Sequence, residues 1–172
     1  MAASRMTLLI VLAATFGLAC SMLGISPTAR YKIIERFPER LGPVEVVGVE
    51  VRSALPVGVI SEADLEKLGS FISERLQHFT IGVIANINGG ADAEQMEVIL
   101  TIDINLFEVA TQEQRRNRVP SYLHGIVSLH RVSTGRKLGK AIVWARGGRL
   151  DLDTNNVPDT VHEFALAIRQ VY

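Results

Sequence analysis

The chain has a single cysteine, Cys20, among its 172 residues. One thiol excludes an internal disulfide, and it excludes metal sites that need several thiolates. Charge of one sign is also not in excess, because 18 Lys and Arg balance 18 Asp and Glu. No overall basic field attracts nucleic acid, and only 6% of the residues are aromatic, so we expect no nucleic-acid partner. A length of this order fits one folded domain.

Motifs that carry chemistry are few as well. None of the serines stands in the sharp turn of a nucleophile elbow. Gly89 and Gly90 belong to no phosphate-binding pattern. His124 and His130 stand six residues apart on one expected strand, roughly 20 Å, which is too far for both to bind one metal ion. We therefore expect no enzyme activity and no cofactor.

The first 20 residues, MAASRMTLLIVLAATFGLAC, have the layout of a secretory signal. Arg5 supplies the positive charge, and an uncharged apolar stretch runs from Met6 to Leu18. Small residues, Gly17 and Ala19, precede the cysteine. This pattern predicts that the chain is exported from the cytoplasm.

The box GLAC, residues 17 to 20, resembles the lipid-attachment signal of bacterial lipoproteins. Ala19 and Cys20 match that signal, whereas the family usually has Leu at the place of Gly17 and a small residue at the place of Leu18. The resemblance implies removal of residues 1–19 and acylation of Cys20, which would anchor the protein to a membrane. Ser21, where Asp would retain a lipoprotein at the inner membrane, implies the periplasmic face of the outer membrane.

Two other interpretations of the same segment stay open. Signal peptidase could cut after Ala19 and release a secreted protein in which Cys20 is a free thiol. Alternatively, the segment from Met6 to Ile25 is never cut, since about 20 uncharged residues are long enough to span a bilayer. All three interpretations place the folded domain outside the cytoplasm.

Residues 20–43 are expected to form a tether, because Pro27, Pro38 and Pro43 disfavour a long regular element. A short helix or strand is possible within it at residues 31–37. A single α/β domain is expected to fill residues 44–172.

Hydrophobic periodicity divides this domain into strands and helices. The most secure helix, over 61–79, starts with the capping pair Ser61 and Asp64. A capping box of Thr160 with Glu163 is expected at the last helix, and a polar loop over 111–121. In a long strand from Met96 to Leu106, the alternate residues from 96 to 106 are expected to share one face. In the strand at 136–146, Trp144 is expected to lie in the core. The elements in order are a strand at 44–53, a helix at 61–79, strands at 80–87, 96–106, 122–132 and 136–146, and a helix at 159–172.

The order of these elements predicts an α+β fold: a single mixed, mostly antiparallel sheet of about five strands with two helices on one face. The order resembles that of periplasmic lipoprotein domains of unknown function and of the amino-terminal α/β domain of TolB. The features that match are the helix EADLEKLGSFISERL after a valine-rich strand, the long strand MEVILTIDINLFEV, the hairpin STGRKL and the closing helix.

Two clusters are candidates for binding. The first cluster resembles the start of a calcium-binding loop, with oxygen ligands at alternate positions, Asp151, Asp153 and Asn155. That motif has Glu at the position of His162, so a polar turn explains the three residues better. On a membrane-tethered protein, the arginines of the polar loop could meet lipid head groups or the phosphates of lipopolysaccharide, although a solvated loop tip is the simpler interpretation. They are Arg115, Arg116 and Arg118.

The sequence therefore favours a lipoprotein of the bacterial cell envelope whose domain binds another envelope protein without catalysing a reaction. An exposed edge of the mixed sheet would offer the surface for that contact. The alternative is a secreted or membrane-anchored small hydrolase or ligand carrier with a pocket that the sequence does not reveal.

Overall fold

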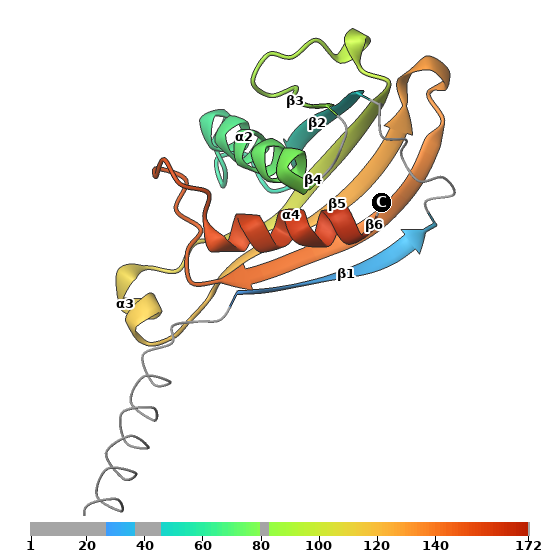
Figure 1. Ribbon diagram of the computed structural model, residues 1–172. Helices are drawn as coiled ribbons and strands as arrows, with labels where there is room; N and C mark the ends of the chain where they lie inside the picture. Colours follow the sequence, from blue (N-terminus) through green and yellow to red (C-terminus); the bar gives the residue numbers. More distant parts are fainter. Residues whose placement is uncertain (1–26, 37–45, 80–82, 172) are drawn as a thin grey trace, which may run out of the picture.

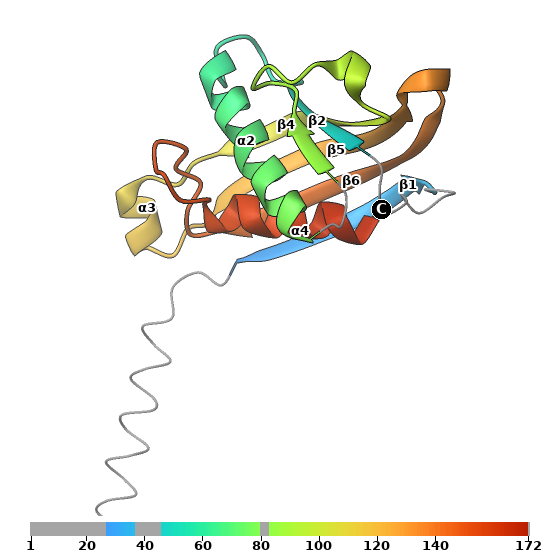
Figure 2. The same cartoon turned by 45° about the horizontal axis from the view of Figure 1, so that its top comes forward.

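The fold is a curved six-stranded sheet with two long helices packed on one face (Figures 1 and 2). The computed structural model describes residues 27–36, 46–79 and 83–171. Its strands are β1 (Thr28–Glu35), β2 (Val46–Ser53), β3 (Val83–Asn86), β4 (Val98–Glu108), β5 (Ser121–Arg131) and β6 (Lys137–Gly147). Its helices are α2 (Glu62–Phe79), α3 (Gln112–Arg116) and α4 (Asp159–Val171), with 3-10 turns η1 (Ala93–Gln95) and η2 (Val132–Thr134).

The strand order β1-β6-β5-β4-β2-β3 confirms the predicted mixed sheet. Strands β4, β5 and β6 follow one another as an antiparallel meander. Strand β2 is parallel to both of its neighbours, β3 and β4. The helix α2 connects β2 to β3, and because these two strands are parallel, the strand–helix–strand unit is a crossover connection.

The sixth strand, β1, lies inside the segment for which the sequence predicted a tether. It pairs antiparallel with β6 through seven residue pairs, from Thr28 opposite Arg146 to Glu35 opposite Lys140. Side chains fasten both ends of this strand, since Arg146 Nε donates to Thr28 Oγ1 at 3.0 Å and Lys137 Nζ lies 2.9 Å from Glu35 Oε1. β1 is therefore an edge strand of the sheet.

Helix α2 begins as its sequence predicts. The backbone N–H of Asp64 donates to Ser61 Oγ at 3.1 Å, and the backbone N–H of Ser61 donates to Asp64 Oδ2 at 3.3 Å. Each of these bonds satisfies a backbone donor that the first helical turn leaves without a partner. The apolar stripe of the helix, Leu68, Ile72 and Leu76, is fully buried against the sheet.

Helix α4 packs beside α2 on the same face, but its start differs from the prediction. The carbonyl of Pro158 accepts from the N–H of His162 at 2.9 Å, so Thr160 lies within the first turn and does not cap the helix. The Thr160 hydroxyl instead donates to the carbonyl of Arg149 at 2.6 Å. Phe164 and Ile168 of this helix are fully buried in the core.

The predicted polar loop between β4 and β5 contains the short helix α3. Thr111 and Gln114 form a complete capping box, in which Gln114 N donates to Thr111 Oγ1 and Thr111 N donates to Gln114 Oε1. The chain then turns at Arg118, whose φ of 61° is left-handed. The helix thus projects from the end of the sheet where β4 stops and β5 starts (Figure 1).

Candidate functional site

The sheet face opposite the helices, here called the open face, carries a shallow groove of about 490 Å³. Its lining comes from four neighbouring strands, β1, β6, β5 and β4. The ladder registers place Lys32 beside Ile142, and they place Trp144 beside His124. The lining residues are Lys32, Leu106, Tyr122, Leu123, His124, Ile142, Trp144 and Ala145.

A break in the strand register brings Leu106 into this groove. The pairing of β4 with β5 shifts between Ile104, which lies opposite Gly125, and Leu106, which lies opposite His124. The prediction that residues 96 to 106 share one face is therefore wrong at Leu106, because an irregularity of one residue moves the following side chains to the other face.

Trp144 was predicted in the core and is instead 37% exposed on the open face. Its position does alternate with the buried Val143 and Ala145, which face the helices. The period-two pattern of β6 was thus recognised, but the strand is apolar on both faces, and the pattern alone did not indicate which face the helices cover.

His124 and Trp144 meet edge to face in the groove, with ring centroids 6.2 Å apart and planes inclined by 74°. Aromatic pairs favour this geometry. Burial lowers the pKa of the His124 imidazole below its ordinary value of 6.5, so the ring is neutral at physiological pH. His130 lies six residues away on the same strand, opposite Ile99, so the structure keeps the two imidazoles apart as the sequence predicted.

The chemistry of this groove is apolar. Its titratable side chains are Lys32, Tyr122 and His124, and no carboxylate belongs to its lining. Among the residues that the structure describes, no group of three or more His, Cys, Asp or Glu side chains could hold a metal ion. The arrangement is suited to contact with an apolar or amphipathic surface.

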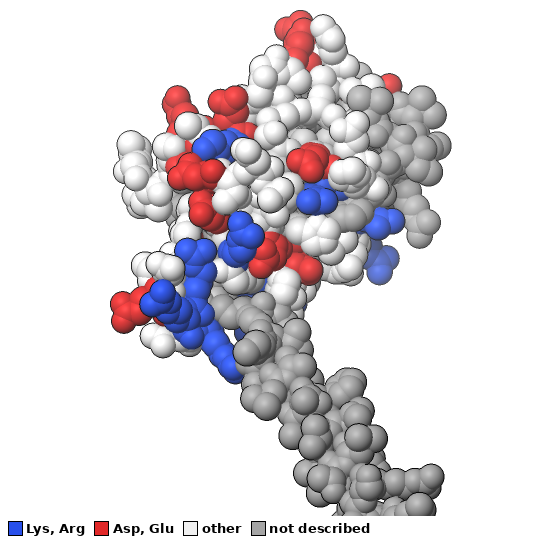
Figure 3. Space-filling model, turned by 60° about the vertical axis from the view of Figure 1, so that its left-hand side comes forward, with Lys and Arg blue, Asp and Glu red and all other residues white. Residues whose placement is uncertain are grey.

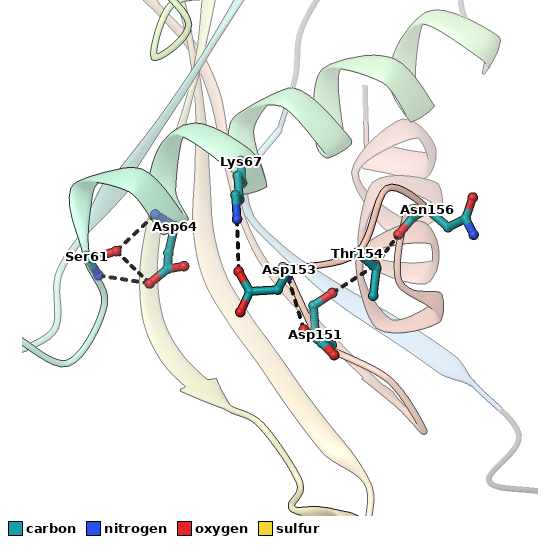
Figure 4. A network of polar contacts seen from close by, with 7 residues as sticks. All are labelled: Ser61, Asp64, Lys67, Asp151, Asp153, Thr154 and Asn156. Carbon is teal, nitrogen blue, oxygen red and sulfur yellow. Dashed lines mark hydrogen bonds and ion pairs between the residues drawn. The ribbon is translucent and has the colours of Figure 1, made fainter.

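The calcium-like residues lie in the loop before α4 (Figure 4). Lys67 Nζ of α2 binds Asp153 Oδ1 at 2.9 Å, and the N–H of Asp153 donates to Asp151 Oδ1 at 3.0 Å. The Thr154 hydroxyl hydrogen-bonds to the carbonyls of Asp151 and Asn156. Asn155 is exposed within the same turn. These contacts close a polar turn and join it to α2.

The predicted arginine cluster lies near further arginines that are distant from it in the sequence. Arg115 and Arg116 form the last turn of α3, and Arg118 follows. Arg146, at the adjacent end of β6, lies opposite both Tyr122 and Thr28. We call the set the arginine end; it consists of Arg30, Arg115, Arg116, Arg118 and Arg146.

Figure 3 shows Lys and Arg side chains gathered at this end of the domain, with most of the acidic side chains of that view above them. Arg30 lies opposite Trp144, two residues from Arg146 on β6, so the ladder places both arginines on the open face. Their nearness to α3 depends on the pairing of β1 with β6, which the sequence did not predict.

Cys20 and the predicted signal lie outside the described residues, so the structure does not place them. Across residues 27–36, 46–79 and 83–171, no helix combines the length and the apolar character that crossing a membrane requires.

By sequence, the chain matches no protein-family model and no curated protein. Its structure is similar to that of PelC from Paraburkholderia phytofirmans, solved as a dodecamer. One PelC structure aligns with a TM-score of 0.56 at 14% identity, over 85% of this chain and 97% of that one. A structure of a PelC point variant aligns with a TM-score of 0.55 at 15% identity and the same coverage. At this identity the likeness shows a shared fold.

Proposed function

We propose that this chain is a lipoprotein of the bacterial cell envelope, anchored through acyl chains on Cys20, whose domain binds another envelope protein without catalysis. The observation that carries the proposal is the coincidence of two independent features. A lipoprotein-like signal ends at the only cysteine of the chain, and the domain that follows has the fold of PelC. A thiol kept only at this position fits covalent use in an oxidising compartment.

A binding role is supported by the composition of the open face. Hydrolysis needs a nucleophile or an activated water with a base beside it, and converging ionisable groups in a cleft. The groove offers instead an apolar floor with one neutral imidazole and one ammonium group. A surface of this kind gains free energy by covering apolar area.

The protein partner that we propose to test first is a second copy of this chain, since the PelC structures are dodecamers. Strand β1 offers the edge for such a contact, because its outer side has no neighbouring strand in the sheet order. Tyr31, Ile33 and Ile34 on this strand are 39%, 43% and 48% exposed. Unpaired backbone groups with exposed apolar side chains favour strand addition.

Radiolabelled palmitate tests the anchor. The wild-type chain should incorporate label in a bacterial host, and Cys20→Ala should not. A wild-type chain that stays unlabelled would overturn the lipoprotein proposal in favour of a cleaved or uncut signal. Ser21→Asp, which keeps Cys20, should remain labelled and move from the outer-membrane fraction to the inner-membrane fraction.

Light scattering of the detergent-solubilised full chain tests self-association. We expect an oligomer that Ile34→Lys on the β1 edge dissociates, whereas Val59→Lys, at an exposed position away from that edge, leaves it intact. A monomeric wild-type chain would direct the search to a different envelope protein.

A further inference from the structure

We infer that the arginine end of the domain docks on an anionic phospholipid surface, with Trp144 and Tyr122 entering the head-group region beside the arginines. This inference rests on the proposed membrane anchor and adds an orientation to it: one particular end of the sheet faces the bilayer. Three features of the molecule support it independently, namely charge, exposed apolar side chains and the position at which the chain enters the domain.

The charge at this end is positive, although the whole chain is neutral. The starts of β1 and β5, the end of β6 and α3 with its flanks bring five arginines, Arg30, Arg115, Arg116, Arg118 and Arg146, against two glutamates, Glu108 and Glu113, a net charge of +3 (5 − 2). The turn from β6 to α4 adjoins this end and adds Arg149, Asp151, Asp153 and Asp159, so the net charge with that turn included is +1 (6 − 5). Figure 3 shows the basic side chains collected on this side, with some acidic side chains at the edge of the cluster and most of the others above it. Anionic lipid head groups attract such a patch.

Exposed apolar side chains surround the arginines. Val109 and Val119 flank α3 and are 46% and 40% exposed. Tyr122 and Trp144, on neighbouring strands of the open face, are 36% and 37% exposed. Trp and Tyr are the residues that proteins place at the level of lipid head groups, because their rings are apolar and their N–H or O–H group remains hydrated.

The entry point of the chain brings this same end to the membrane. Strand β1 begins at Thr28, and Arg146 both pairs with Thr28 in the ladder and donates to its hydroxyl at 3.0 Å. Eight residue steps (28 − 20) separate Cys20 from Thr28, which span at most about 28 Å when fully extended. If the uncut apolar segment is the anchor, that segment ends at Ile25, only three residue steps before Thr28. The start of β1 then lies still closer to the membrane.

A short connection of this kind raises the effective concentration of lipid at the arginine end. The contact of the arginine end with head groups then behaves as an intramolecular event, so a modest intrinsic affinity is enough. The opposite end of the sheet, which bears the β5–β6 hairpin with Arg136, is directed away from the bilayer. Tyr122 and Trp144 also line the groove on the open face, so docking covers that part of the groove, whereas the part lined by Lys32 and Ile142 remains reachable.

Trp144 provides the readout, because it is the only tryptophan of the chain. The full chain is reconstituted into vesicles of phosphatidylglycerol and phosphatidylcholine, in which lipids brominated near the head group quench nearby tryptophan emission. Flotation of the vesicles reports the anchor, and quenching reports the docking. We expect the wild-type chain to float and Trp144 to be quenched at low salt. Quenching should be weaker in pure phosphatidylcholine and at molar salt, where screening shortens the range of the charges.

The variant Arg115→Gln/Arg116→Gln should lower the ratio of docked to undocked domain by on the order of tenfold while flotation is unchanged. Its matched control is Arg36→Gln/Arg136→Gln, which removes the same charge from exposed positions at the opposite end of the sheet and should quench like the wild type. Circular dichroism of both variants verifies that they are folded.

Several results would overturn the inference. A chain that floats with unquenched Trp144 leaves the anchor in place and refutes the docking. Shielding of Trp144 from both brominated lipid and aqueous acrylamide means that a protein covers this surface instead. Equal quenching in the two double variants, or in charged and neutral vesicles, refutes the role of the arginines. A chain that fails to float refutes the anchor, and the inference falls with it.

Discussion

Thr160 lies directly against Gly147, so the first turn of α4 rests on a residue of β6 that has no side chain. A Cβ atom at position 147 would come within 2.6 Å of Thr160 Oγ1 and 3.1 Å of Thr160 N. The hydroxyl itself is held by its bond to the carbonyl of Arg149. Because Gly147 has no Cβ, α4 can pack this closely on β6.

The variant Gly147→Ala should destabilise the domain by about 1–3 kcal/mol, because the added methyl meets backbone as well as side-chain atoms and α4 must shift. Urea denaturation measures the free energy of unfolding. In a Thr160→Ala background the same change should cost less, since the nearest atom has been removed, and the double-mutant cycle isolates that coupling. Strict additivity would show that this contact does not limit the packing.

Asn88 completes the pairing of β2 beyond the end of β3. Its Oδ1 accepts from Val51 N at 2.6 Å and its Nδ2 donates to Val51 O at 2.8 Å, so a side-chain amide substitutes for a neighbouring strand. Asn88→Ala should cost about 1–3 kcal/mol, because a half-buried backbone N–H and C=O lose their partners. Asn155→Ala, at an exposed position, serves as the control, and equal unfolding midpoints for the two variants would contradict this role.

His124 should make stability depend on pH in a predictable direction. Its pKa in the folded protein is below the 6.5 of the unfolded chain, so the unfolded state takes up the proton first as the solution is acidified. The free energy of unfolding should therefore decrease as the pH drops through 6.5. Below the pKa of His124 in the folded protein both states carry the proton, and this contribution stops changing. Thermal melts of wild type and His124→Gln between about pH 7.5 and about pH 5 test this, since the variant keeps no proton site there. Parallel curves would exclude the effect.

The boundary of the folded unit can be tested by truncation. A chain that starts at Pro27 retains β1, whereas one that starts at Val44 leaves the β6 edge and the β1-facing side of α4 uncovered. We expect the longer chain to be monodisperse in the absence of detergent at low concentration and the shorter one to aggregate or to melt earlier. Equal solubility and melting temperature would place the start of the folded unit at Val44, as the sequence predicted.

Elements with strong local signals were predictable from the sequence. The capping pair Ser61–Asp64 and the stripe Leu68, Ile72 and Leu76 are enough to define α2, because both depend only on neighbours within two helical turns. The β5–β6 hairpin is equally local, with Gly135 in the left-handed conformation. The helix α3 was missed, although the spacing of Thr111 and Gln114 is the same kind of capping signal.

Features that depend on distant pairing were not predictable. For β1 the sequence left a short helix or strand open at residues 31–37, and only the pairing with β6 decides that the segment is a strand. The exposure of Trp144 and the position of Leu106 follow from which face the helices cover and from one register break, neither of which leaves a local pattern. The arginine end was not predictable for the same reason. Arg146 is far in sequence from Arg115, and only the pairing of β6 with its neighbouring strands places it at that end.

The pairing of Thr28 with Arg146 across 118 positions has a consequence for biogenesis. Under the proposed export, amino terminus first, β1 crosses early and its ladder partner β6 crosses only when most of the polypeptide is outside. The β4–β6 meander needs only nearby contacts, whereas β1 needs a contact that closes a long loop, and such contacts form slowly. The pairing of β1 with β6 therefore cannot precede near-complete translocation.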